Sequence, residues 1–230
     1  MTATPYYDRD GITIWHADCR DILPTIDPAA VALLLTDPPY GIDYPGDHAD
    51  RATNGRLAGG RVQASSRSWP RIAGDTERFD PAPLLRFGNA VLWGGNFYAS
   101  RLPDSGKWLV FDKCGPDGKS SPMRGDAELA WTNLPGERVE LFSKIWHGAP
   151  RWREEPILHP AQKPVALMHW IIDRWTKPGD LILDPYMGSG PVARAAQLLG
   201  RRYIGIELVE DYCKAAVNRL AQPSMFQEAS

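Results

Sequence analysis

Two segments of the 230-residue sequence hold residue types suited to chemistry. The first is Asp37-Pro38-Pro39-Tyr40, directly after the apolar run Val31–Thr36. Proline fixes φ and lacks an N–H donor, so this stiff turn presents carbonyl acceptors. Asp37 adds a charged acceptor and Tyr40 adds a flat aromatic face. The set suits a planar ligand with an exocyclic amino group, although a structural turn after a strand would also explain it.

The second segment has a strand-like run that ends at Asp184, followed by a turn with Gly188 and Gly190 that opens a helix. Glycine lets the backbone approach a ligand closely, and a helix N-terminus offers free N–H groups to an anion. The next strand ends at Glu207, whose carboxylate can accept both hydrogen bonds of a ribose diol. The spacing of Gly188, Gly190 and Ala193 also fits a loose dinucleotide fingerprint, so a nicotinamide-dependent dehydrogenase stays open. A structural turn without a ligand also stays open.

An α/β scaffold is expected to position both segments. Apolar runs predict strands at 12–15, 31–36, 90–93, 108–111, 128–131, 139–145, 181–183 and 203–206. Periodic patterns predict helices at 165–176, 192–199 and 210–220, and Gly200 is placed to end the second helix. Several strand runs are continuously apolar, as in strands covered on both faces. Open sheets of this class bind ligands at the carboxyl ends of their strands, where both segments begin.

Charge is distributed unevenly along the chain. Lys plus Arg total 26 and Asp plus Glu total 28, for a net charge of -2. Residues 51–71 nevertheless hold five arginines and no acid, namely Arg51, Arg56, Arg61, Arg67 and Arg71. We expect a long mobile basic loop over residues 44–78 that is either a solvated linker or a segment that orders on a polyanion. A second basic stretch contains Lys144, Arg151 and Arg153, diluted by two glutamates.

Composition excludes several classes of protein. The hydrophobic fraction of 43% and the charged fraction of 23% are ordinary for a globular chain. No apolar run approaches the roughly 20 residues that span a membrane, and the N-terminus lacks the apolar core of a signal peptide. Three scattered cysteines are too few for a disulfide framework or a zinc site. A cytoplasmic protein without a structural metal is expected.

Taken in order, the motifs resemble the amino-methylating DNA methyltransferases that act on adenine N6 or cytosine N4. The Asp-Pro-Pro-Tyr motif precedes the glycine motif, which is similar to the permuted order of the β group of that family. Three further segments agree with the family: Trp15–Cys19, His159–Pro164 and Trp93–Asn96. The last of these resembles an element common in phage-type members. Tyr186 and Pro191 stand where the family often has Phe and Thr. Pro191 suits the first position of a helix, although it lacks the hydroxyl of Thr.

The resemblance implies a Rossmann-like S-adenosylmethionine-dependent methyltransferase fold, with a mixed seven-stranded sheet and helices on both faces. It implies a single domain over residues 1–230, with a catalytic half at 12–145 and a cofactor half at 159–220. A small target-recognition segment is expected at 144–158. It further implies methyl transfer to adenine N6 in a specific sequence of double-stranded DNA, without a covalent enzyme intermediate. By analogy with its relatives, a homodimer is expected.

Residue roles follow from the same resemblance. The catalytic residues are Asp37, Pro38, Pro39 and Tyr40. The cofactor residues are Asp18, Cys19, Gln162, Lys163, Asp184, Pro185, Tyr186, Gly188, Ser189, Gly190 and Glu207. DNA contacts are expected from Arg51, Arg56, Arg61, Arg67, Arg71, Lys144, Arg151 and Arg153. The rival functions are cytosine-N4 DNA methylation, RNA or protein-glutamine methylation, a nicotinamide-dependent dehydrogenase and a non-enzymatic DNA-binding module.

Overall fold

The computed structural model of the protein describes residues 4–44, 71–114, 125–146, 156, 158–159 and 161–222. Most of the arginines expected to contact DNA lie outside these ranges: Arg51, Arg56, Arg61, Arg67, Arg151 and Arg153. Most of the basic loop and of the target-recognition segment therefore also falls outside the described residues. Arg71 and Lys144 lie inside them.

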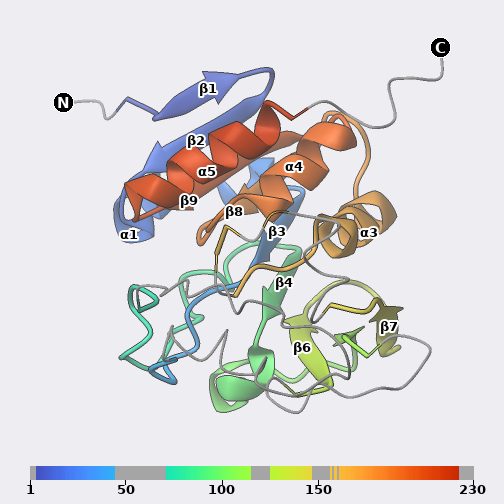
Figure 1. Ribbon diagram of the computed structural model, residues 1–230. Coiled ribbons are helices and arrows are strands. Elements are labelled where there is room, and N and C mark those ends of the chain that lie inside the picture. The colour runs from blue at the N-terminus through green and yellow to red at the C-terminus, as the bar shows by residue number, and fades with distance from the viewer. Residues whose placement is uncertain are drawn as a thin grey trace, which may run out of the picture.

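The described strands form a mixed sheet of nine strands in the order β1-β2-β9-β8-β3-β4-β6-β5-β7 (Figure 1). Their bounds are β1 Tyr7–Arg9, β2 Ile12–His16, β3 Leu33–Thr36, β4 Ala90–Trp93, β5 Trp108–Asp112, β6 Ala127–Thr132, β7 Glu140–Ser143, β8 Leu181–Asp184 and β9 Arg202–Glu207. The central strands β2, β9, β8, β3 and β4 are parallel to one another. Strand β6 is antiparallel to both β4 and β5, and β1 is antiparallel to β2. The predicted mixed sheet is confirmed.

The expected number of seven strands is wrong, because the described sheet has nine. Each apolar run that was predicted as a strand contains one, and β1 adds one more strand, which forms a hairpin with β2. The hairpin turn is Asp10-Gly11, and both residues have positive φ, at 53° and 77°. Asp-Gly is a preferred pair for such two-residue turns. A strand of three residues is too short to show alternation in the sequence.

Helices cover both faces of the sheet, as predicted. On one face lie α3 Val165–Trp175, α4 Pro191–Leu198 and α5 Glu210–Leu220, drawn in orange to red in Figure 1. Their buried side chains share one core with those of β2 and β8. On the other face, α1 Cys19–Ile22 joins short 3-10 helices and the segment around Phe79 and Phe87 in a second core. None of the helices within the described ranges is long and apolar enough to cross a membrane.

Local sequence explains the elements nearest to the two motifs. Every residue of β3 and β4 is buried, which accounts for their unbroken apolar runs. Pro191 is the first residue of α4, where its missing N–H costs nothing. Gly190 before it has φ 76°, and a Cβ there would lie 2.7 Å from the Cβ of Ala216 in α5. Glycine is therefore required for both the turn and the close packing of α4 against α5.

Between β3 and β8 the side of the sheet to which the chain adds its next strand changes. These two strands are adjacent and parallel, with Leu33 opposite Ile182. From β3 the chain continues to β4 on one side, whereas from β8 it continues to β9 on the other. Such a switch point opens a crevice at the carboxyl ends of the strands, where α/β sheets bind ligands. The two motifs follow these two strands.

Candidate active site

A cleft of about 980 Å³ opens at the carboxyl ends of the parallel strands. Many of the residues expected to act in catalysis or binding line it: Asp18, Cys19, Asp37, Pro38, Pro39, Tyr40, Arg71, Gln162, Lys163, Pro185, Tyr186, Gly188 and Glu207. The structure therefore brings together the Asp-Pro-Pro-Tyr turn, the glycine turn and the segment before α3, which are far apart in the sequence.

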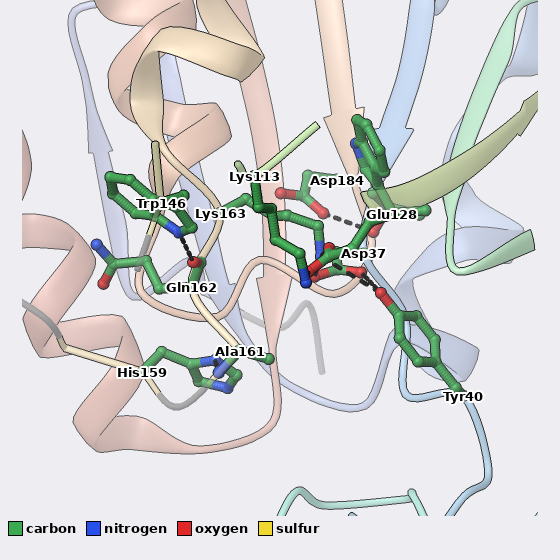
Figure 2. Close-up of polar contacts among 12 residues, drawn as sticks. Asp37, Tyr40, Lys113, Glu128, Trp146, His159, Ala161, Gln162, Lys163 and Asp184 are labelled. Atoms are coloured by element: carbon green, nitrogen blue, oxygen red, sulfur yellow. Dashed lines mark hydrogen bonds and ion pairs between the residues drawn. The ribbon is translucent and has the colours of Figure 1, made fainter. Parts of the chain in front are cut away.

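Asp37 follows β3 and has both carboxylate oxygens engaged (Figure 2). Tyr40 donates its hydroxyl proton to Asp37 Oδ1 at 2.5 Å, and Lys163 Nζ donates to Asp37 Oδ2 at 2.6 Å. Lys163 Nζ also lies 3.3 Å from the Tyr40 oxygen. The Asp37 side chain keeps 21% of its accessible surface, so a ligand in the cleft can reach it. Each oxygen retains a second lone pair for a further donor.

Behind Asp37 lies a row of alternating charges. Lys163 Nζ is 2.8 Å from Glu128 Oε2, and Lys113 Nζ is 3.1 Å from Glu128 Oε1. Both lysine side chains are almost fully buried, at 5% and 6% exposure. Burial would raise the pKa of Glu128, but Lys163 and Lys113 outweigh it and lower that pKa to about 2. Glu128 is therefore an anion at neutral pH.

Burial and the charge of Lys163 act on the pKa of Asp37 in opposite directions. Loss of water raises the pKa of Asp37, and the Lys163 ammonium counteracts that rise. Burial would lower the pKa of Lys163, but Asp37 and Glu128 outweigh it and raise that pKa. Burial and the Asp37 charge raise the pKa of Tyr40 well above its usual value, so its hydroxyl stays protonated and donates.

An aromatic pair stands at the mouth of this part of the cleft. The ring of Tyr40 stacks on Phe97, with centroids 4.9 Å apart and planes inclined by 14°. Phe97 is 52% exposed. Gly94 has φ 73°, and a Cβ there would lie 2.0 Å from a Tyr40 ring carbon. Only glycine can occupy this position while the Tyr40 ring keeps its place.

The glycine turn and Glu207 form the other end of the cleft. Glu207 Oε2 accepts a hydrogen bond from Gly188 N at 2.8 Å, and Oε1 accepts one from Val209 N at 2.8 Å. Burial raises the pKa of Glu207, and these backbone donors partly oppose that rise. The imidazole of His159 packs edge-on against Tyr212, with centroids 4.6 Å apart. His159 therefore lies at this end of the cleft.

Asp18 ends the turn after β2 and begins α1. Its carboxylate accepts from Arg20 N at 2.9 Å and forms an ion pair with the Arg20 guanidinium at 2.5 Å. Hydrogen bonding to Arg20 lowers the pKa of Asp18. The next residue, Cys19, is buried and packs beneath the cleft. These two residues therefore shape the end of the cleft next to Glu207.

Three of the expected cofactor residues do not line the cleft: Asp184, Ser189 and Gly190. Asp184 is 1% exposed, and it accepts from Thr36 Oγ1 at 2.7 Å and from the Tyr203 hydroxyl at 3.2 Å. Burial raises the pKa of Asp184 to about 7. Ser189 Oγ donates to Gln162 Oε1 at 3.1 Å, so it ties the glycine turn to the segment before α3.

The expected DNA contacts are only partly described. Arg71 lines the cleft and forms an ion pair with Asp43 at 2.7 Å. Nearby, the buried carboxylate of Asp75 accepts from Gly41 N at 2.8 Å and from Tyr44 N at 2.6 Å. These contacts hold residues 41–44 against residues 71–75 beside the cleft. Lys144 does not line the cleft.

Sequence reasoning missed Glu128, Lys113 and Phe97. A signal existed for the first two. Glu128 is a lone charge within the apolar strand β6, and Lys113 directly follows β5. A charge next to an apolar run needs a partner if the fold buries it. Among the described residues, no group of three or more His, Cys, Asp or Glu side chains is arranged to hold a metal ion.

Comparison with known proteins gives a consistent result. A sequence model of the DNA methylase family that comprises N6 and N4 enzymes matches residues 113–218. The type II methyltransferase M.ScaI of Streptomyces caespitosus is 28% identical over 94% of this chain and 83% of its own length. The type II methyltransferase M2.LlaDCHI of Lactococcus lactis subsp. cremoris is 26% identical over 96% and 93%. The chain is therefore similar to these DNA methyltransferases along nearly its whole length.

Solved structures show the same fold as this methyltransferase. The M1.HpyAVI–SAM complex has a TM-score of 0.55 at 26% identity and covers 91% of this chain and 100% of its own. The cytosine-N4-specific PvuII DNA methyltransferase has a TM-score of 0.61 at 15% identity and covers 97% and 91%. At that lower identity the likeness shows the fold alone. The Rossmann-like methyltransferase fold implied by the sequence motifs is confirmed.

Proposed function

We propose that this methyltransferase transfers a methyl group from S-adenosylmethionine to the N6 amino group of adenine in a specific sequence of double-stranded DNA. One observation carries the proposal. The acceptor group Asp37 and the glycine turn follow two adjacent parallel strands and line one cleft. An amine held by Asp37 would thus face the reactive part of a cofactor that lies along the glycine turn. The permuted order of the two motifs supports membership in the β group.

The residues at the glycine-turn end fit S-adenosylmethionine. The Glu207 carboxylate lies in the cleft and keeps lone pairs for a ribose diol beyond its two backbone donors. Tyr186, Leu208 and Tyr212 offer apolar surface to an adenine ring. When bound, the cofactor supplies an electrophilic methyl group on a sulfonium. Asp18, Cys19 and Gln162 complete the proposed cofactor site.

Asp37 and Pro38 are proposed to activate the amine. The nitrogen lone pair of an exocyclic amine is delocalised into the ring, which makes it a poor nucleophile. Hydrogen bonds from its two protons to the Asp37 carboxylate and the Pro38 carbonyl would turn the nitrogen towards a tetrahedral geometry. Positive charge then develops on nitrogen beside Asp37. Because this attraction is greatest in the transition state, it accelerates the reaction rather than only tightening binding.

The target base must leave the duplex to reach Asp37, at a cost of a few kcal/mol. The Tyr40–Phe97 pair supplies aromatic surface beside Asp37, and stacking of a base on such surface contributes about 1–3 kcal/mol. We propose that Tyr40 and Phe97 form the wall on which the flipped base stacks. This offsets part of the cost of extrusion.

DNA is proposed to lie across the cleft mouth. Arg71 and the other arginines of segment 51–71 would contact phosphates, and Lys144, Arg151 and Arg153 would help to read bases. A homodimer and a cytoplasmic location also belong to the proposal. Cytosine N4 is the second candidate, since its amine offers the same two protons to Asp37. Aspartate rather than serine before Pro-Pro-Tyr favours adenine in the family that the motifs resemble.

A direct test is to incubate the purified protein with duplex DNA and S-adenosylmethionine and to digest the DNA for nucleoside mass spectrometry. We expect N6-methyladenosine, and long-read sequencing of DNA from expressing cells should place it in one sequence context. The product N4-methylcytosine would overturn the adenine assignment. Binding of S-adenosylmethionine without methylation of any DNA would overturn the proposed function.

The matched variants are Asp37→Asn and Asp173→Asn. Asp37→Asn keeps the shape of the side chain but removes the charge, so we expect methyl transfer to fall by at least about 100-fold, as when another charge-stabilising group is removed. Binding of S-adenosylmethionine should persist, because Asp37 lies outside the proposed ribose and adenine contacts. Asp173 is an exposed aspartate on α3, at 62% exposure, and Asp173→Asn should retain activity.

A further inference from the structure

Lys163 is held between two carboxylates rather than facing the glycine turn. Its Nζ lies 2.6 Å from Asp37 Oδ2 and 2.8 Å from Glu128 Oε2 (Figure 2). The ammonium also lies over the ring of Trp93, 5.7 Å from its centroid. The Lys163 side chain is long and flexible, but it is 5% exposed and contacts Asp37, Glu128 and the Trp93 ring, so it has little conformational freedom left. The family resemblance assigns this lysine to the cofactor instead.

We infer that Lys163, anchored by Glu128, is a positioning residue that keeps Asp37 anionic and holds its carboxylate with Oδ1 turned towards the target amine. The inference rests on the proposed function of Asp37 as the acceptor for that amine. It assigns roles in this site to two residues outside the Asp-Pro-Pro-Tyr motif.

The positions of the hydrogen bonds support the orienting role. Lys163, whose side chain is 5% exposed, donates to Oδ2, and Tyr40 donates to Oδ1. Two donors on different oxygens fix the rotation of the carboxylate. Glu128 in turn fixes Lys163 from β6, and Lys113 fixes Glu128 from the end of β5. Asp37 is thereby oriented by the sheet itself.

The charges support the role in ionisation. Asp37, Lys163, Glu128 and Lys113 alternate in sign and sum to zero. Removing the charge of Lys163 would leave Asp37 facing a like charge on Glu128 at a dehydrated site. Both effects favour the protonated carboxyl, which cannot stabilise positive charge on the amine. Removing the charge of Glu128 would act in the opposite direction on Asp37, because it deletes an anion.

Other groups also face Asp37 from the elements packed around it. Tyr40 donates from the same turn, and Tyr98, which follows β4, is close enough to Asp37 for that charge to help raise its pKa. Asp184 at the end of β8 is close enough for its own pKa to be raised by Asp37. Neither tyrosine changes charge near neutral pH, since burial raises the pKa of both. Asp184 is unaltered in every variant below, so its contribution is common to all.

The test measures single-turnover methyl transfer as a function of pH for the wild type, Lys163→Met, Lys163→Arg and Glu128→Gln. In Lys163→Met the acidic limb of the profile should move to higher pH by about 1–3 pH units, the range for loss of an adjacent opposite charge. In Glu128→Gln the limb should move to lower pH, while the maximum rate falls because Lys163 is less firmly held. Lys163→Arg keeps the charge and should keep the wild-type limb.

A matched control is available in Lys107. Its side chain is 7% exposed, and its Nζ pairs with Glu140 at 2.9 Å and with the Pro135 carbonyl at 2.9 Å, away from the cleft lining. Lys107→Met should lower stability without moving the acidic limb. This control separates loss of a buried ion pair from loss of the charge beside Asp37.

Two outcomes would overturn the inference. An acidic limb that is unchanged in Lys163→Met would mean that the lysine is only structural. A raised KM for S-adenosylmethionine with an unchanged limb would assign the lysine to the cofactor instead. If the wild type fails to methylate DNA, carbon-13 NMR of the aspartate carboxyls still tests the inference. The Asp37 signal is assigned by its loss in Asp37→Asn. The pKa of Asp37 should then be higher in Lys163→Met than in the wild type, and an unchanged pKa would overturn the inference.

Discussion

Replacing Asp184 by asparagine should change how the stability of the protein depends on pH. Asp184 is buried at the end of β8, and its pKa is raised from 3.8 to about 7 by loss of water. The folded state therefore holds a proton that the unfolded chain releases. Asp184 contributes stability that is fully present below pH 3.8 and is lost as the pH rises through about 7. The amide in Asp184→Asn does not titrate, so this component should vanish in the variant.

The size of the effect follows from the two pKa values. Between pH 5 and about pH 7 the folded carboxyl holds a proton that the unfolded chain has lost. Over these two pH units the free energy of unfolding falls by about 1.4 kcal/mol per pH unit. The wild type should thus lose about 2.5 kcal/mol relative to Asp184→Asn across this range. A constant offset will accompany it, because the amide cannot accept from all three donors to this carboxylate, which are Thr36 Oγ1, the Tyr203 hydroxyl and Tyr186 N. One lost hydrogen bond costs about 1–3 kcal/mol at every pH.

The assay is urea unfolding of both proteins without cofactor at pH 5, 6, 7 and 8, followed by fluorescence. Equal slopes with denaturant would show that the unfolding reactions are comparable. The difference in unfolding free energy between Asp184→Asn and the wild type should grow with pH in favour of the variant. A difference that stays constant within the extrapolation error, or that changes in the other direction, would refute the argument about the buried carboxyl.

Three further substitutions test the cleft. Gly94→Ala places a methyl group where the Tyr40 ring lies, so it should lower methyl transfer by more than about tenfold, measured as single-turnover rate, while the fold measured by circular dichroism persists. Glu207→Ala removes the proposed ribose acceptor and should weaken S-adenosylmethionine binding by about 10- to 200-fold in calorimetry; unchanged affinity would contradict the assignment. Phe97→Ala removes part of the aromatic wall, and it should reduce kcat/KM for DNA by about 5- to 150-fold without changing cofactor affinity.

Local signals in the sequence predict much of the fold. The runs that became β3, β4 and β8 are short, apolar and followed by Pro or Gly, so neighbouring residues suffice to identify them. Pro191 begins α4 and Gly200, with φ 67°, follows it, as predicted. The Asp-Pro-Pro-Tyr and glycine turns were found for the same reason, since each is a contiguous motif with its own chemistry.

The missed residues depend on contacts that are remote in the sequence. Glu128 acquires its role only because Lys163 reaches it from the segment before α3, 2.8 Å away in space. In the sequence alone it is only a lone charge in an apolar strand, and nothing there names its partner. Asp184 was expected to face the cofactor, but its carboxylate lies among Thr36 and Tyr203 instead. The direction of a side chain at the end of a strand depends on the neighbouring strands, and a single sequence does not specify them.

The strand order also has a consequence for biosynthesis. Strand β3, which directly precedes Asp37, lies beside β8, and β2 lies beside β9, although about 150 residues or more separate the members of each pair. Synthesis proceeds from the N-terminus, and such non-local pairings form slowly. While the ribosome is still extending the chain through β7, β2 and β3 each have one edge without a partner strand. The environment of Asp37 is thus completed only by the last quarter of the chain, so a truncated translation product would contain the proposed catalytic motif without the proposed cofactor site.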